Sequence, residues 1–119
     1  MTTSTAPPRP DPVRAILLAA ADLLEQDGAW CQHAHARDAE GYATHPRAAE
    51  AMSWCPIGAI DRIAHEANGE TSHSAEAQKR LTKTLVREGY LGTVYWNDIR
   101  QRTQANVVAM LRRVAGEET

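Results

Sequence analysis

The chain contains no phenylalanine, and aromatic residues make up only 5% of its 119 residues. An interior with so few rings must be filled mostly by aliphatic side chains and alanine, and alanine is the strongest helix former. A chain of this length builds one modest hydrophobic core and has no room for a second domain. The composition therefore favours a single domain that is mainly α-helical.

The sequence also lacks an excess of charge, a long apolar run and a large set of cysteines. Its formal net charge of -2 gives no general attraction to nucleic acid or to an anionic membrane. No run approaches the roughly 20 apolar residues of a membrane span. Residues 1–12 are polar and proline-rich, without the apolar core of a signal peptide. We therefore expect a cytoplasmic protein without membrane contact, whose two cysteines are reduced.

Aliphatic residues at helical spacing predict four helices, which cover about residues 12–27, 55–67, 74–88 and 103–115. Asp11 and Pro12 are suited to the cap and the first position of the first helix. Gly28 and Gly89 are suited to end the first and third helices, and Asn68-Gly69 to end the second.

The remaining segments predict little regular structure. Residues 1–10 are expected to form a disordered tail, which leaves residues 11–119 for the helical domain. A turn signal from Asp38 to Gly41 makes a small hairpin plausible within residues 34–43. Residues 90–96 have a β-like composition, typical of one short strand or an extended connector. The expected fold is a compact bundle of about four helices with a short β-hairpin or small β element.

All three tryptophans and both cysteines occur in three short motifs: Trp30-Cys31, Trp54-Cys55 and Trp96-Asn97-Asp98. Large indoles beside reactive or polar side chains suggest a pocket, and we expect the three motifs to meet around one partly polar cleft. The expected walls of the cleft are Trp30, Trp54 and Trp96, and its expected polar contacts are Cys55, Arg37, Asn97 and Asp98.

Cys55 is a candidate nucleophile because it precedes Pro56 and so falls at the start of a predicted helix. The unpaired N–H groups and the positive dipole end of a helix favour a thiolate there. Cysteine is also among the most buried residue types, and a core thiol beside Trp54 would be inert. The order of Cys55, His65 or His73, and Asn97 is that of papain-like proteases, but those enzymes need a far longer chain.

Other polar residues carry weaker signals. The residues that could ligate zinc are Cys31, His33, His35, His45 and Cys55. The first three would share one face of an extended segment, yet no standard zinc spacing is present, so no metal site is predicted. Arg37-Asp38 is either a solvated ion pair or an anchor for an anion. Lys79, Lys83 and Arg87, with Arg80 alongside, form a basic face on one predicted helix; without interleaved aromatic residues this face does not favour nucleic-acid binding.

Several motifs in one order give the sequence a family resemblance. They are Trp30-Cys31-Gln32, Ala36-Arg37-Asp38, Gly41, Trp54-Cys55 with Gly58-Ala59, and Trp96-Asn97-Asp98. In this pattern, which covers about residues 13–115, the chain resembles a family of small proteins of unknown function met mainly in actinobacteria and their phages. The resemblance implies no activity. His33 and His35 lie where other residue types are expected in that family, which weakens the metal hypothesis further.

We expect a small binding or accessory protein that recognises a small ligand or a peptide segment at the cleft. The ligand-binding candidates are Trp30, Arg37, Asp38, Trp54 and Trp96. One alternative is a cysteine-dependent hydrolase or transferase, whose candidates are Cys55 or Cys31 with Asn97 and Asp98. Another alternative is phosphate or nucleic-acid contact through the basic helix face. No cofactor is predicted, and the sequence does not define the ligand, the partner or the oligomeric state.

Overall fold

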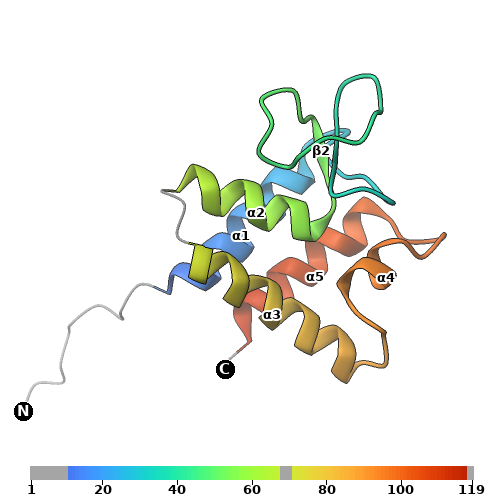
Figure 1. Cartoon of the computed structure of the whole chain (residues 1–119). Helices are drawn as coiled ribbons and strands as arrows, with labels where there is room; N and C mark the ends of the chain where they lie inside the picture. The colour runs from blue at the N-terminus through green and yellow to red at the C-terminus, as the bar shows by residue number, and fades with distance from the viewer. Residues whose placement is uncertain (1–10, 68–70, 118–119) are drawn as a thin grey trace, which may run out of the picture.

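The computed structural model describes residues 11–67 and 71–117, which form a small helical bundle with a minor β element (Figure 1). Its helices are α1 (Pro12–Glu25), α2 (Pro56–Glu66), α3 (Thr71–Arg87), α4 (Thr93–Asn97) and α5 (Gln104–Gly116), and its strands are β1 (Ala36–Arg37) and β2 (Ser53–Trp54). The prediction of a mainly α fold with a small β element is confirmed. The predicted tail at residues 1–10 and the predicted Asn68-Gly69 cap lie outside the described residues.

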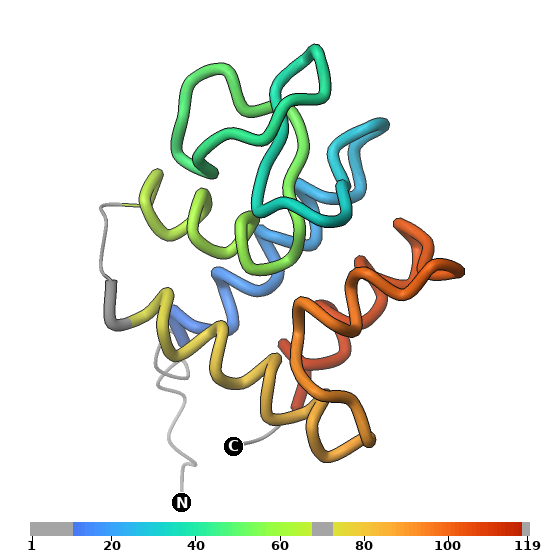
Figure 2. Tube along the Cα trace, turned by 45° about the vertical axis from the view of Figure 1, so that its right-hand side comes forward, coloured from blue at the N-terminus to red at the C-terminus, as the bar shows by residue number. Residues whose placement is uncertain are grey.

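Helix α1 lies at the centre of the bundle and packs against α2, α3 and α5 (Figures 1 and 2). The carboxylate of Asp11 accepts the N–H groups of Val13 and Arg14, both at 3.1 Å, and Pro12 occupies the first turn as expected. The helix ends two residues earlier than predicted, at Glu25, and Gly28 has a positive φ of 74° in the turn that follows. Leucines, valines and one isoleucine fill the centre: Leu17, Leu24, Ile60, Leu81, Leu85, Val107, Leu111 and Val114.

Local sequence signals position α2 and α5 at the predicted places. Cys55 is the N-cap of α2 and Pro56 its first residue, as expected. Helix α5 begins with a capping box, in which Thr103 and Asn106 each accept the backbone N–H of the other. In the described part of the chain, no helix is long and apolar enough to cross a membrane.

Two predicted elements need correction. Residues 90–96 do not form a strand, because Thr93–Asn97 is a short helix, so the described bundle has five helices rather than about four. The hairpin predicted within 34–43 is reduced to a turn and a single bridge between Arg37 and Ala43. The strand partner of β1 is β2, which is antiparallel to it, with Ala36 opposite Trp54.

Candidate functional site

The side chain of Asn97 joins two of the tryptophan motifs. It is 1% exposed at the C-terminal end of α4. Its Oδ1 accepts the indole N–H of Trp30 at 2.7 Å, and its Nδ2 donates to the carbonyl of Cys31 at 3.1 Å and to Oδ1 of Asp98 at 3.2 Å. The Trp30-Cys31 and Trp96-Asn97-Asp98 motifs therefore meet in space, as the sequence analysis predicted.

Gln32 and His33 extend the same junction. The side-chain amide Nε2 of Gln32 donates to the backbone carbonyls of Asn97 at 2.8 Å and Ile99 at 2.9 Å. The backbone N–H of His33 donates to Oδ1 of Asp98 at 2.9 Å. His33 has a φ of 65°, an uncommon conformation for a residue with a side chain. Sequence reasoning assigned neither residue this structural role, although Gln32 belongs to the conspicuous Trp-Cys-Gln motif.

Strand β2 brings the third motif to the junction. Trp30 and Trp54 form a parallel bridge, in which the N–H of Cys31 donates to the carbonyl of Trp54 at 3.0 Å. On the other side of β2, the N–H of Cys55 donates to the carbonyl of His35 at 3.2 Å. Segments that are far apart in the sequence thus come together before α2 begins.

A cleft of about 410 Å³ opens between the segment after Gln32 and helix α4. We call it the Asp98 cleft, and its lining residues are His33, Ala34, His35, Cys55, Val94, Asn97 and Asp98. Of the residues predicted to contribute, Cys55, Asn97 and Asp98 are at its wall. The polar groups of Asn97 are engaged within the protein, so the carboxylate of Asp98 and the imidazoles of His33 and His35 dominate the chemistry at the rim.

The three indoles do not line this cleft, contrary to expectation. Trp54 is buried, donates its N–H to the carbonyl of Pro46 at 3.0 Å, and lies under the guanidinium of Arg62. Trp96 is buried beneath Arg102, whose guanidinium carbon is 4.1 Å from the ring centre. Each indole N–H or ring face therefore already has a protein partner, and none of the three tryptophans is a lining residue of the cleft.

The thiols are less acidic than the position of Cys55 suggested. Burial raises the pKa of Cys55 to about 11, although the N–H groups of Gly58 and Ile57 act in the opposite direction. The Gly58 N–H is 3.4 Å from the sulfur, so the expected helix-end interaction exists but is outweighed. Burial also raises the pKa of Cys31, partly countered by Ser53 and Arg37. Both cysteines are free and buried, which favours the alternative in which Cys55 is an inert core thiol beside Trp54.

Arg37 and Asp38 build the loop that carries the cleft. The guanidinium of Arg37 donates to the carbonyls of Gln32 at 3.0 Å and Gly41 at 2.9 Å. The carboxylate of Asp38 accepts the N–H groups of Glu40 and Tyr42. Neither residue lines the Asp98 cleft. Among the described residues they form no ion pair with each other, so the solvated ion pair that was one of the two predicted alternatives is not formed, and their side chains hold the backbone of the loop instead.

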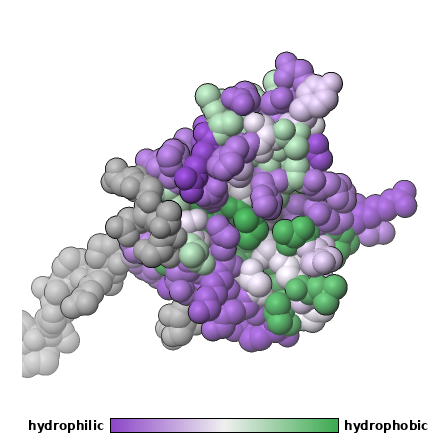
Figure 3. Space-filling view, in the orientation of Figure 1, coloured by the Kyte–Doolittle hydropathy of each residue, from purple (hydrophilic) through white to green (hydrophobic). Residues whose placement is uncertain are grey.

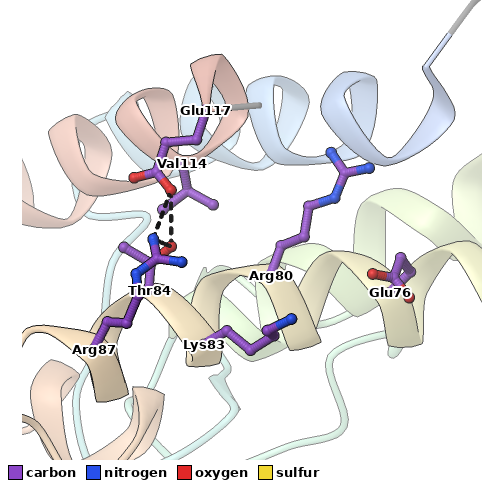
Figure 4. A pocket seen from close by; sticks show the side chains of 7 residues that line it. All are labelled: Glu76, Arg80, Lys83, Thr84, Arg87, Val114 and Glu117. Atoms are coloured by element: carbon purple, nitrogen blue, oxygen red, sulfur yellow. Dashed lines mark hydrogen bonds and ion pairs between the residues drawn. The ribbon is translucent and has the colours of Figure 1, made fainter. Parts of the chain in front are cut away.

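The basic face of α3 lies at a separate cavity of about 230 Å³, between α3 and the end of α5 (Figure 4). Arg80 bonds the carboxylate of Asp11 at 3.3 Å, and Arg87 bonds that of Glu117 at 3.2 Å. Figure 4 shows the charged ends of Arg80, Lys83 and Arg87 apart from one another. This face is therefore not assembled around one anion. In the part of the chain that the structure describes, no group of three or more metal-ligating side chains is close enough to hold an ion.

Comparison with known proteins places the chain in a family. Residues 8–117 match the model of a family of unknown function, DUF6197. No curated protein and no solved structure matches the chain.

Proposed function

The chain belongs to the DUF6197 family, and since the family brings no activity with it, we propose from the chain's own geometry that the protein is a binding or accessory module. It recognises a small ligand or a peptide segment in the Asp98 cleft. The observation that carries the proposal is the cleft itself, whose rim presents a carboxylate and two imidazoles beside an apolar side chain.

The size and rigidity of the cleft suit binding. Its volume falls in the range of about 300–1,000 Å³ that is usual for ligand pockets. Its two walls are fixed to each other by the bonds from Asn97 to Trp30 and Cys31, and by those from Gln32 to the carbonyls of Asn97 and Ile99. A pocket that is ordered before its ligand arrives loses less conformational freedom on binding.

Exposed apolar side chains extend from the cleft toward the end of α3. Val94 lines the cleft and is 47% exposed, while Leu91 is 81% exposed three residues earlier. Val86 and Tyr95 are exposed on the same stretch of chain. Figure 3 shows hydrophobic side chains gathered over the C-terminal end of α3 and the beginning of α4. An apolar surface next to a polar pocket favours a peptide or protein partner.

The state of the cysteines supports binding over cysteine catalysis. A nucleophilic cysteine acts as a thiolate, which requires a lowered pKa and an accessible sulfur. Cys55 and Cys31 are both buried and both have a raised pKa. Two unbridged thiols are also what a reducing compartment maintains, so the proposal includes a cytoplasmic location.

A fragment screen followed by ¹H–¹⁵N correlation spectra tests the proposal. A panel of small molecules and short peptides is added to the labelled protein, and the shifted amides are mapped onto the structure. We expect the shifts to cluster at the lining of the cleft, on both the 33–35 segment and α4. Shifts confined to the α3 face around Lys83 and Arg87, or no binder from the whole panel, would contradict the proposal. The variant Lys83→Gln serves as a matched control that should bind as the parent does.

A further inference from the structure

We infer that the group recognised by the Asp98 cleft is an organic cation on an apolar stem, a protonated amine or a guanidinium, seated on the carboxylate of Asp98. The inference rests on the proposed function and adds the chemical class of the ligand. Three observations support it: the negative charge of Asp98 at the cleft wall, the hydrogen bonds from the described residues, which occupy only one of its two oxygens, and the apolar side chain of Val94 beside it.

The carboxylate of Asp98 is largely withdrawn from water, with 22% of its side chain exposed. Its Oδ1 accepts the N–H of His33 at 2.9 Å and the amide of Asn97 at 3.2 Å. Its Oδ2 has a longer contact, 3.6 Å from Nδ1 of His33. A carboxylate removed from water is stabilised when it is paired with a cation and its remaining lone pairs are satisfied. Oδ2 is the atom with capacity for such a partner.

Several other carboxylates of the protein are neutralised by arginine side chains. Asp61 is paired with Arg47 at 2.8 Å, Glu88 with Arg113 at 2.7 Å, and Glu25 with Arg112 at 2.9 Å. Among the described residues, no lysine or arginine forms an ion pair with Asp98. These three acids are satisfied within the fold, whereas the negative charge of Asp98 faces the cleft.

Three further side chains near the carboxylate bear on its charge. His33 is 67% exposed at its side chain, and His35 is also exposed at the rim. Arg37 does not line the cleft, and its guanidinium donates to the carbonyls of Gln32 and Gly41 instead of pairing with Asp98. Among the described residues no lysine or arginine covers the Asp98 carboxylate, and its contact with the His33 imidazole is long, at 3.6 Å. An anionic ligand would therefore meet a like charge there, and the arrangement favours a cation.

Val94 provides an apolar surface beside the Asp98 carboxylate. It lines the cleft four residues before Asp98, whose backbone N–H donates to the carbonyl of Val94 at 3.0 Å. A cation seated on Asp98 therefore has an aliphatic surface beside it for its stem. Such a ligand is either a free alkylamine or alkylguanidine, or the lysine or arginine side chain of a peptide, and Leu91 and Tyr95 would then meet the neighbouring residues of the peptide.

Probes with one stem and different charges test this inference. Butylamine, butylguanidine and butyrate are titrated into the labelled protein, together with the peptide amides acetyl-Leu-Arg and acetyl-Leu-Glu. We expect the two cations and the arginine peptide to shift the amides of His33, Val94 and Asp98, and butyrate and the glutamate peptide to leave them unchanged. Binding by the arginine peptide at least tenfold tighter than by butylguanidine identifies a peptide as the source, and equal affinity identifies a small molecule.

Asp98→Asn is the decisive variant, because its amide oxygen can still accept the His33 N–H while the charge is lost. We expect Asp98→Asn to bind the cationic probes at least tenfold more weakly than the parent does. Asp61→Asn, which removes a charge outside the cleft, should leave their affinity unchanged. Butyrate binding as tightly as butylamine, no shift with any cation, or equal cation affinity in Asp98→Asn would each overturn the inference. If the cations do not bind but neutral or anionic fragments still bind in the cleft, the cation inference is wrong and the proposed function stands. If nothing binds in the cleft, both the inference and the proposed function are wrong.

Discussion

Replacing Asn97 with alanine should destabilise the protein more than its small loss of volume implies. The substitution leaves the indole N–H of Trp30 and the carbonyl of Cys31 without their partner. An orphaned buried polar group costs about 1–3 kcal/mol, and the half-buried position of Trp30 places its cost at the lower end. The sum is about 2–4 kcal/mol, which corresponds to a fall in melting temperature of roughly 4 °C for each kcal/mol in a chain of this size.

Urea unfolding followed by tryptophan fluorescence measures this loss, with the dependence on urea concentration expected to stay unchanged. A second substitution, Trp30→Phe, isolates the bond at 2.7 Å. In the double variant the orphaned indole N–H no longer exists. We therefore expect the double variant to lose about 1 kcal/mol less stability than the sum of the losses in the two single variants. A loss below about 1 kcal/mol for Asn97→Ala, or strictly additive effects, would refute the role of Asn97 as the junction of the two motifs.

Three further predictions follow from the fold. The rate of alkylation of Cys55 in the native protein should rise with pH, with a midpoint near pH 11, because the folded state raises the pKa of the thiol above that of an unfolded cysteine. A midpoint below about pH 8.5 would contradict a buried, neutral thiol. Gly58→Ala should lower the free energy of unfolding by about 1–3 kcal/mol, since a Cβ there overlaps the carbonyl oxygen of His35, whereas Gly116→Ala, in open space, should not. Thr103→Ala should cost about 1 kcal/mol in urea unfolding by removing the cap of α5, and an unchanged midpoint would count against the capping box.

The elements that the sequence predicts well are those with local chemical signals. Asp11 with Pro12, and Cys55 with Pro56, begin helices where caps and proline are favoured in any context. Helix α4 was missed because the residues from Val94 to Trp96 have strand-like preferences. In the fold, Trp96 is buried, and the Thr93 hydroxyl is 2.8 Å from that of Thr82 on α3. Contacts between distant elements therefore override the local preference.

The same distinction applies to the cleft. The motifs predicted that Cys31, Asn97 and Asp98 come together, and the Asn97 amide bonds both the carbonyl of Cys31 and the carboxylate of Asp98. Whether a thiol ionises depends on how deeply the fold buries it, and that depth is not encoded in the position of Cys55 at a helix start. The direction of an indole depends on which carbonyl or amide lies within reach, such as that of Pro46 for Trp54.

Filling the Asp98 cleft tests its role as a binding site most directly. Ala34 lines the cleft, and Ala34→Phe places a ring in its volume while leaving the carboxylate of Asp98 intact. Isothermal titration with acetyl-Leu-Arg amide, on protein whose helical circular dichroism matches the parent, is the measurement. We expect the parent to bind the peptide and Ala34→Phe to bind it with at least tenfold lower affinity. Equal affinity in the two proteins would contradict recognition in this cleft.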